Sequence, residues 1–170
     1  MVDLFTDQPL RGADVSECGQ FRYLLWRSWG PGRRLLFIML NPSTADADQD
    51  DPTIRKCMGF ARRLKFDGIE VVNLFAFRAT DPRDLACAGH PEGPANNEAI
   101  ASAGQRCIDT NSTTVCAWGA NARQFPRRTE RVRTSLALAG VRLRALRLLK
   151  DGTPEHPLML PYSCSLVPLA

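Results

Sequence analysis

The sequence has very few of the residues that build metal centres. Only two histidines are present, His90 and His156, and neither is at ligand spacing from a cysteine, so a zinc site is not expected. The six cysteines are scattered and contain no C-x-x-C pair. Because no secretion signal accompanies them, we predict free thiols rather than disulfides, no bound metal and no cofactor.

Long apolar runs are also missing. No stretch approaches the roughly 20 apolar residues that a membrane-spanning helix needs, and the start of the chain carries no basic segment followed by an apolar one. These absences predict a cytoplasmic protein without membrane contact. The 170 residues contain no internal repeat, and their 44% hydrophobic and 24% charged content suits one globular domain over residues 1–170.

The charge balance sets few limits on the partner. The net charge is +4 and the pI is about 8.9, so the chain permits a polyanionic partner such as DNA without requiring one. The sequence does not fix the oligomeric state, and a monomer is expected.

Apolar and amphipathic segments alternate along the chain. Apolar runs predict strands at residues 21–29, 35–40, 69–74 and 113–117, and within residues 141–149. Helices are predicted to begin at Pro52, where Asp51 is the N-cap, at Pro94, and at Pro126, the last ending near residue 139. The four later strands alternate with these three helices. This order predicts an α/β fold, a three-layer α/β/α sandwich around a four-stranded, mainly parallel sheet, with residues 75–93 mostly loop and a proline-rich tail.

Polar or glycine-containing segments follow the ends of these strands. Asn41, Asn73, Gly119 and His156 each lie in such a segment. In open parallel sheets, ligands bind outside the carboxyl ends of the strands. We therefore predict that these four residues, although far apart in the sequence, line one pocket.

Each of these residues has a structural and a functional interpretation. Asn41 precedes Pro42, so it is either a turn residue or a side chain held in a restricted direction. Asn73 closes an apolar strand, and its amide either bonds to loop backbone or offers a donor and an acceptor to a nucleobase edge. His156, between two prolines, is either structural or a stabiliser of negative charge on a leaving group. Gly119 permits a positive φ or a close approach.

Two charged clusters also have alternative interpretations. Arg123, Arg127 and Arg131 are spaced at i, i+4 and i+8, which predicts one helix face that is either solvated or in contact with phosphates. The acidic residues between 46 and 51 lack the EF-hand glycine and final glutamate, so a solvated, helix-capping loop is predicted there.

Longer motifs connect the chain to a known domain family. Residues 37–46 read FIMLNPSTAD, residues 51–55 DPTIR and residues 72–82 VNLFAFRATDP, followed by AWG at 117–119 and KDGTPEHPL at 150–158. This set closely resembles a conserved bacterial and phage domain family of uncharacterised function. The resemblance covers nearly the whole chain and implies no particular activity.

The order of four shorter motifs resembles the uracil-DNA glycosylase superfamily. These motifs are Asn41-Pro42, Asn73, the segment AWGANA at 117–122, and His156-Pro157-Leu158. The resemblance implies a uracil-DNA glycosylase-like fold in which Asn41 orients water, Asn73 reads an extruded base and His156 stabilises the departing base. It also implies substrate contacts from a wider set of residues: Pro42, Ser43, Asn73, Phe75, Gly119 and Lys150. Leu158 stands where the superfamily has serine, and the aromatic residue that stacks on the base has two candidates, Phe75 and Phe77.

The function expected on these grounds is hydrolysis of the bond between a nucleobase and its sugar, in DNA, as in DNA repair. Asn41 and His156 are the expected catalytic residues, and the three arginines are the expected nucleic-acid contacts. Because an amide is not a general base, we expect slow turnover or an easy leaving group. Two alternatives stay open. One is a hydrolase or binder of free nucleosides, nucleotides or modified bases, and the other is a non-catalytic nucleic-acid-binding module.

Overall fold

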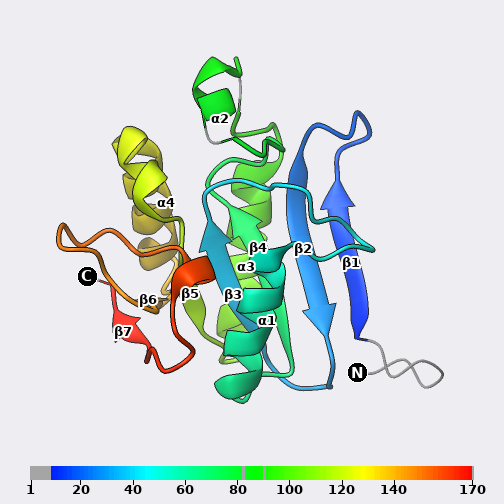
Figure 1. Ribbon diagram of the computed structural model, residues 1–170, viewed down its shortest axis with the longest axis vertical. Helices are drawn as coiled ribbons and strands as arrows, with labels where there is room; N and C mark the ends of the chain where they lie inside the picture. The colour runs from blue at the N-terminus through cyan, green and yellow to red at the C-terminus, as the bar shows by residue number, and fades with distance from the viewer. Residues whose placement is uncertain (1–8, 82, 90, 170) are drawn as a thin grey trace.

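The computed structural model describes residues 9–81, 83–89 and 91–169 and has a single mixed sheet at its centre (Figure 1). The strand order is β1-β2-β4-β3-β5-β6-β7. The strands are β1 (Leu10–Val15), β2 (Arg22–Ser28), β3 (Arg34–Met39), β4 (Gly68–Asn73), β5 (Thr114–Cys116), β6 (Leu143–Ala145) and β7 (Val167–Pro168). The helices are α1 (Pro52–Arg63), α2 (Arg83–Cys87), α3 (Asn96–Asp109) and α4 (Pro126–Leu138), with 3-10 helices η1 (Ala120–Gln124) and η2 (Pro157–Met159).

The chain is therefore an α/β protein, but its sheet is larger than the sequence indicated. Strands β4, β3, β5 and β6 pair in parallel at the centre. Strand β2 pairs antiparallel with β4, β1 pairs antiparallel with β2, and β7 pairs antiparallel with β6. The expected four-stranded sheet is thus wrong in size, since the sheet has seven strands and is mixed. The missed edge strands are β1, which pairs with the next strand of the chain, and β7, which pairs with β6, and their own residues show little apolar alternation.

Apolar cores lie on both faces of the sheet. On one face, Ile54, Cys57 and Phe60 of α1 pack against strand residues such as Phe37, and Figure 1 shows α1 crossing this near face. On the other face, α3 and α4 supply the apolar side chains Ile100, Ala103, Cys107, Val132 and Leu136. None of the helices among the described residues is long and apolar enough to cross a membrane.

The helix boundaries follow local chemistry. The Asp51 side chain accepts the Ile54 N–H at 2.8 Å, and Pro52 occupies the first turn, so α1 begins as the sequence predicts. Helix α3 begins at Asn96 rather than at Pro94. The short helix α2 lies within the segment that was expected to be loop.

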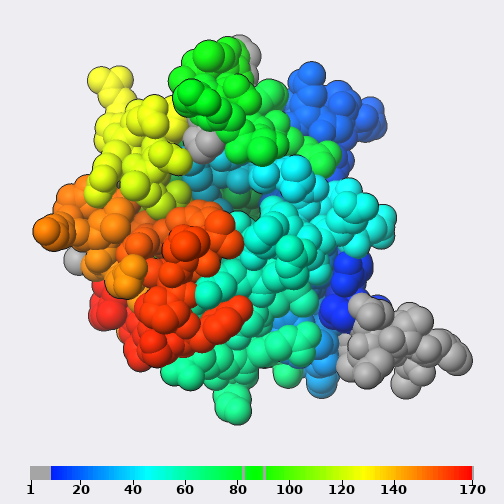
Figure 2. Space-filling model, in the orientation of Figure 1, coloured from blue at the N-terminus to red at the C-terminus, as the bar shows by residue number. Residues whose placement is uncertain are grey.

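The C-terminal segment closes one side of the near face. In Figure 2 its orange and red atoms lie against the cyan and green atoms of α1. The contact is aromatic, because Tyr162 packs edge-on against Phe60 with ring centroids 4.9 Å apart. This packing holds the loop that carries His156 next to the N-terminal half of the molecule.

Candidate functional site

A cleft of about 220 Å³ lies at the carboxyl ends of β3 and β4. Asn41, Ser43, Asn73, Trp118 and His156 all line it. They come from four separate segments, each following a parallel strand. The strand-exit rule therefore locates the cleft, and it brings together three side chains that are far apart in the sequence.

Asn41 is fixed in the cleft by its amide nitrogen. Its Nδ2 donates to the backbone oxygens of Pro42 at 3.0 Å and Ala79 at 2.7 Å. The Ala79 N–H in turn donates to the Pro42 oxygen at 2.9 Å, so two walls of the cleft are joined here. These bonds identify the nitrogen end of the amide. The Oδ1 atom is then the part of the side chain that is left to accept a hydrogen bond from a ligand or a water.

Asn73 presents a buried donor without a partner. The residue is only 1% exposed, and its Nδ2 has no hydrogen-bond partner among the residues that the structure describes. The backbone at this position is fixed by Asn96, whose Nδ2 donates to the Asn73 and Leu74 oxygens at 2.9 and 3.1 Å. A buried unpaired donor costs about 1–3 kcal/mol. A position that keeps such a donor next to a cleft is suited to binding a ligand acceptor.

His156 is held as a neutral imidazole. It is the N-cap of η2, and its Nδ1 accepts the Leu158 N–H at 3.3 Å. The proton of the neutral ring is then on Nε2, which remains available as a donor. Burial lowers the pKa of His156, and the negative charge of Asp51 offsets part of that shift. The lowered pKa therefore favours His156 as a neutral donor at physiological pH rather than as a cation.

Gly119 makes the approach of His156 possible. Its φ is +78°, in the region that favours glycine, and a Cβ at this position would lie 3.0 Å from the His156 Cβ. Its N–H donates to the Pro154 oxygen at 3.0 Å, which joins the end of β5 to the loop that carries His156. Gly119 contributes backbone conformation, while the neighbouring Trp118 lines the cleft.

Arg22 is a lining residue that sequence reasoning missed. The side chain is only 3% exposed, its Nη1 donates to the Ala45 oxygen at 2.6 Å, and its Nε has no partner among the described residues. Burial lowers its pKa to about 10, so it stays charged at neutral pH. The available signal was a charged residue at the start of an otherwise apolar strand. Asp51, which was expected only to cap α1, lines the cleft as well.

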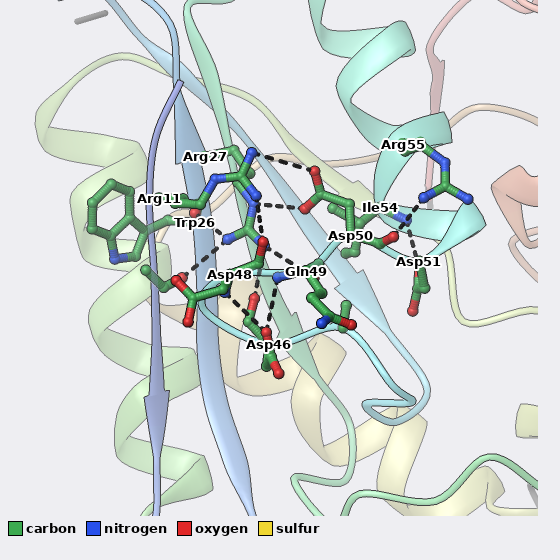
Figure 3. Close-up of polar contacts among 12 residues, drawn as sticks. Arg11, Trp26, Arg27, Asp46, Asp48, Gln49, Asp50, Asp51, Ile54 and Arg55 are labelled. Carbon is green, nitrogen blue, oxygen red and sulfur yellow. Dashed lines mark hydrogen bonds and ion pairs between the residues drawn. The ribbon is translucent and has the colours of Figure 1, made fainter. Parts of the chain in front are cut away.

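The acidic loop next to the cleft is folded around a second buried arginine (Figure 3). Arg27 is 0% exposed, and it donates to Asp50 Oδ1, the Asp46 oxygen and the Trp26 oxygen at 2.7, 2.7 and 2.8 Å. Asp46 Oδ1 accepts the N–H groups of residues 48 and 49, both at 2.9 Å. The expectation of a merely solvated loop is corrected here, because a buried cation gathers its carbonyl groups and one carboxylate.

Some expected contact residues lie away from the cleft. Phe75 packs in the core against Phe125, with ring centroids 4.7 Å apart, and Lys150 is exposed in a turn. Pro42 is buried and serves through its backbone oxygen. Neither Phe75 nor Phe77 is among the lining residues, and Trp118 is the aromatic side chain that the described residues contribute to the cleft.

The three arginines do not share one helix face. Arg123 lies in η1, whereas Arg127 and Arg131 lie in α4. The break occurs because Phe125 has a non-helical backbone, with φ −127° and ψ 53°, and α4 starts anew at Pro126. Arg123 is paired with Asp151 at 2.6 Å, and Arg131 is paired with Glu92. Most of the positive charge of this group is therefore already neutralised by neighbouring carboxylates.

All six cysteines are free thiols. Cys57, Cys107 and Cys116 are buried among apolar side chains, where burial raises the pKa of each thiol. Over the described residues, no three His, Cys, Asp or Glu side chains gather in a way that could hold a metal ion.

The fold and the cleft define an α/β protein with a small polar binding site at the carboxyl ends of its parallel strands. The chain belongs to the family described as "Protein of unknown function (DUF1643)", whose sequence pattern matches residues 22–158. The matched region begins at Arg22 and ends just after His156, so it contains every residue of the cleft described above. No curated protein and no solved structure matches the chain.

Proposed function

We propose that the protein is an N-glycosidase that hydrolyses the bond between a nucleobase and its sugar. The observation that carries this proposal is the buried, unpartnered Nδ2 of Asn73 in a cleft that it shares with Asn41 and His156. The amide of Asn73 can donate to a carbonyl oxygen of a base and accept from a ring N–H. A cleft of about 220 Å³ suits a single ring system better than a drug-sized ligand.

In the proposed reaction, Asn41 orients the attacking water. Its Nδ2 is already bonded to two backbone oxygens, so the water donates to Oδ1. As the C1′–N bond breaks, the base leaves with the electron pair, and the water oxygen forms the new bond to C1′. The water proton passes to solvent or to the departing base, because an amide is not a general base. Asp51 is the one carboxylate among the described residues that line the cleft, and its Oδ1 is bonded to the Ile54 N–H.

His156 stabilises the base as negative charge develops on it. A neutral Nε2–H donor suits this role, because it strengthens its bond as the charge grows without transferring its proton first. The lowered pKa of His156 and the bond to its Nδ1 both favour that protonation state. Gly119 and the loop bond to Pro154 keep the ring in position before the reaction starts.

The resemblance to the uracil-DNA glycosylase superfamily supports this assignment of roles. In that resemblance Asn41 corresponds to the water-orienting residue, Asn73 to the base-reading residue and His156 to the residue that faces the leaving group. Leu158 in place of serine removes one expected phosphate contact. The proposal therefore rests on the cleft, with the resemblance as support.

Two substrates are compatible with this chemistry. A base in DNA fits the glycosylase resemblance and would be extruded into the cleft. A free nucleoside or nucleotide fits the charge distribution better, because Arg123 and Arg131 are held by carboxylates and contribute little to binding a phosphate backbone.

A screen for base release tests the proposal. The folded protein is incubated with free nucleosides, nucleotides, and single- and double-stranded oligonucleotides that contain common or modified bases, and products are identified by mass spectrometry. We expect a free base together with the corresponding sugar product. Binding of a base-containing ligand without any release would identify a binding module instead, and the absence of both binding and release would overturn the proposal.

A further inference from the structure

Arg22 has more binding capacity than the protein itself uses. Among the described residues its guanidinium forms a single hydrogen bond, to the Ala45 backbone oxygen, and has no carboxylate within ion-pair distance. The contrast with Arg27 on the same strand is direct, since Arg27 is equally buried but is paired with Asp50 at 2.7 Å. Asp51 lines the same cleft, and its negative charge partly stabilises the guanidinium without forming an ion pair with it. Desolvating a cation without a directly paired counter-ion is costly. A charge retained in this state next to a cleft indicates that a ligand supplies the missing partner.

The partner that satisfies Arg22 is an anion. A guanidinium has donors only, so a base carbonyl could occupy one of them but would not neutralise the charge. A phosphate offers several acceptor oxygens in the geometry that arginine binds best. A neutral nucleoside would fill the cleft and leave the charge of Arg22 offset only by carboxylates that are not paired with it, such as Asp51.

The surroundings of Arg22 in the cleft also suit a phosphate. Thr53 and Ile54, in the first turn of the 12-residue helix α1, line the same cleft, and the N-terminal end of a helix carries partial positive charge. The hydroxyl of Ser43 is in the lining as well. Asp51 offsets part of this potential, but its Oδ1 is already bonded to the Ile54 N–H at 2.8 Å.

We propose that the substrate of the cleft carries a phosphate group and that Arg22 binds it, with Ser43 and the start of α1 next to it. The inference builds on the proposed function, since it specifies that the base to be released belongs to a nucleotide rather than to a nucleoside. The phosphate is either the monoester of a free nucleotide or a diester of a nucleic-acid strand. Both present the same oxygens to the guanidinium.

Isothermal titration of the full chain with matched ligands tests the inference. The probes are inorganic phosphate, nucleosides, their 5′-monophosphates, and short single strands of the same base. We expect a monophosphate or a strand to bind at least about 10-fold tighter than its nucleoside, which is the scale of a charge-assisted hydrogen bond. Preference for the monophosphate identifies a free nucleotide, and preference for the strand identifies a nucleic acid.

Variants then assign the preference to Arg22. Arg22→Met should abolish the advantage of the phosphorylated ligand while leaving the weak binding of the nucleoside. Arg22→Lys keeps the charge and should retain part of the advantage, which guards against a simple loss of folding in the Met variant. Arg63→Met, at the exposed C-terminal end of α1 and outside the cleft, is the matched control and should bind like the wild type.

The outcomes are separable from those of the proposed function. Equal affinity for nucleoside and nucleotide, no binding of any phosphate probe, or unchanged phosphate binding in Arg22→Met would overturn the inference and leave Arg22 as a structural residue. Phosphate binding that depends on Arg22, without base release from any substrate, would support the inference and reject only the glycosidase. Base release without an Arg22-dependent preference for phosphorylated ligands would support the glycosidase and reject only the inference about Arg22.

Discussion

The substitution Asn73→Leu separates function from stability at the centre of the cleft. Leucine has the same branching at Cγ as asparagine but is larger, and the cleft that Asn73 lines leaves room for the extra volume. The substitution removes a buried Nδ2 that lacks a partner among the described residues. An unsatisfied buried donor costs about 1–3 kcal/mol. The variant should therefore gain about 1 kcal/mol or more in free energy of unfolding, which corresponds to an increase in Tm of about 2–4 °C for a domain of this size. It should also lose base recognition, because the reading amide is gone.

Asn96→Leu is the matched control for this experiment. Asn96 is 0% exposed, and its Oδ1 also lacks a partner among the described residues, but its Nδ2 donates to the Asn73 and Leu74 oxygens. Leu74 keeps a second donor, Arg128 Nε at 2.6 Å, whereas the Asn73 oxygen loses this side-chain partner. Asn96→Leu removes the unpaired Oδ1 but also breaks both of these hydrogen bonds and leaves the Asn73 oxygen without this donor, so we expect a net cost of about 1–3 kcal/mol.

Urea denaturation followed by circular dichroism measures both variants, and titration with the best nucleobase ligand measures recognition. The reasoning requires opposite signs for the two changes in stability. If Asn73→Leu is destabilised as much as Asn96→Leu, then the Asn73 amide is a structural group, and its assignment as the base-reading residue fails.

Three further perturbations test the site and its supports. Gly119→Ala should lower the free energy of unfolding by about 1–3 kcal/mol and slow base release, because the new Cβ meets His156 at 3.0 Å; unchanged thermal stability would contradict this. Arg27→Met should lower the free energy of unfolding by about 3–5 kcal/mol, measured by urea denaturation, because Asp50 and the loop oxygens lose the bonds to a cation that is 0% exposed. A decrease below about 1 kcal/mol would show that the acidic loop does not depend on Arg27 for its stability. Burial lowers the pKa of His156, so its NMR titration should have a midpoint below the usual value of about 6.5. As pH falls below that value, the unfolded chain binds the proton more readily than the folded chain, so the free energy of unfolding decreases. His156→Gln should make this decrease smaller. A titration midpoint at or above about 6.5 would contradict a pKa lowered by burial.

The parts of the fold that local patterns specify were predictable from the sequence. The apolar runs of β3 and β4 predicted strands, and Asp51-Pro52 predicted the start of α1. The strand-exit rule then placed Asn41, Asn73 and His156 together, although each segment alone had an equally good structural interpretation.

The missed features depend on partners in other elements rather than on the residues of the element itself. Strands β1 and β7 exist through their partners β2 and β6, so their own residues give little signal. The ion pair between Arg123 and Asp151 joins residues from separate elements, and for that reason the arginines looked like a free cationic face. The burial of Arg22 follows from its position in the assembled sheet, and the strand sequence alone gave only its place before an apolar stretch as a signal.

The most direct test of the glycosidase is the single-turnover rate of base release by three proteins: the wild type, Asn41→Ala and His156→Ala. The substrate is the one that the screen selects, and circular dichroism verifies that each variant is folded. Removing one donor that acts on developing charge typically costs about 100- to 1,000-fold in rate. We predict that the wild type releases free base, and that His156→Ala binds the same substrate with nearly unchanged affinity but cleaves it at least about 100-fold more slowly. No base release from any substrate by the wild type, or equal rates for wild type and His156→Ala, would contradict the account.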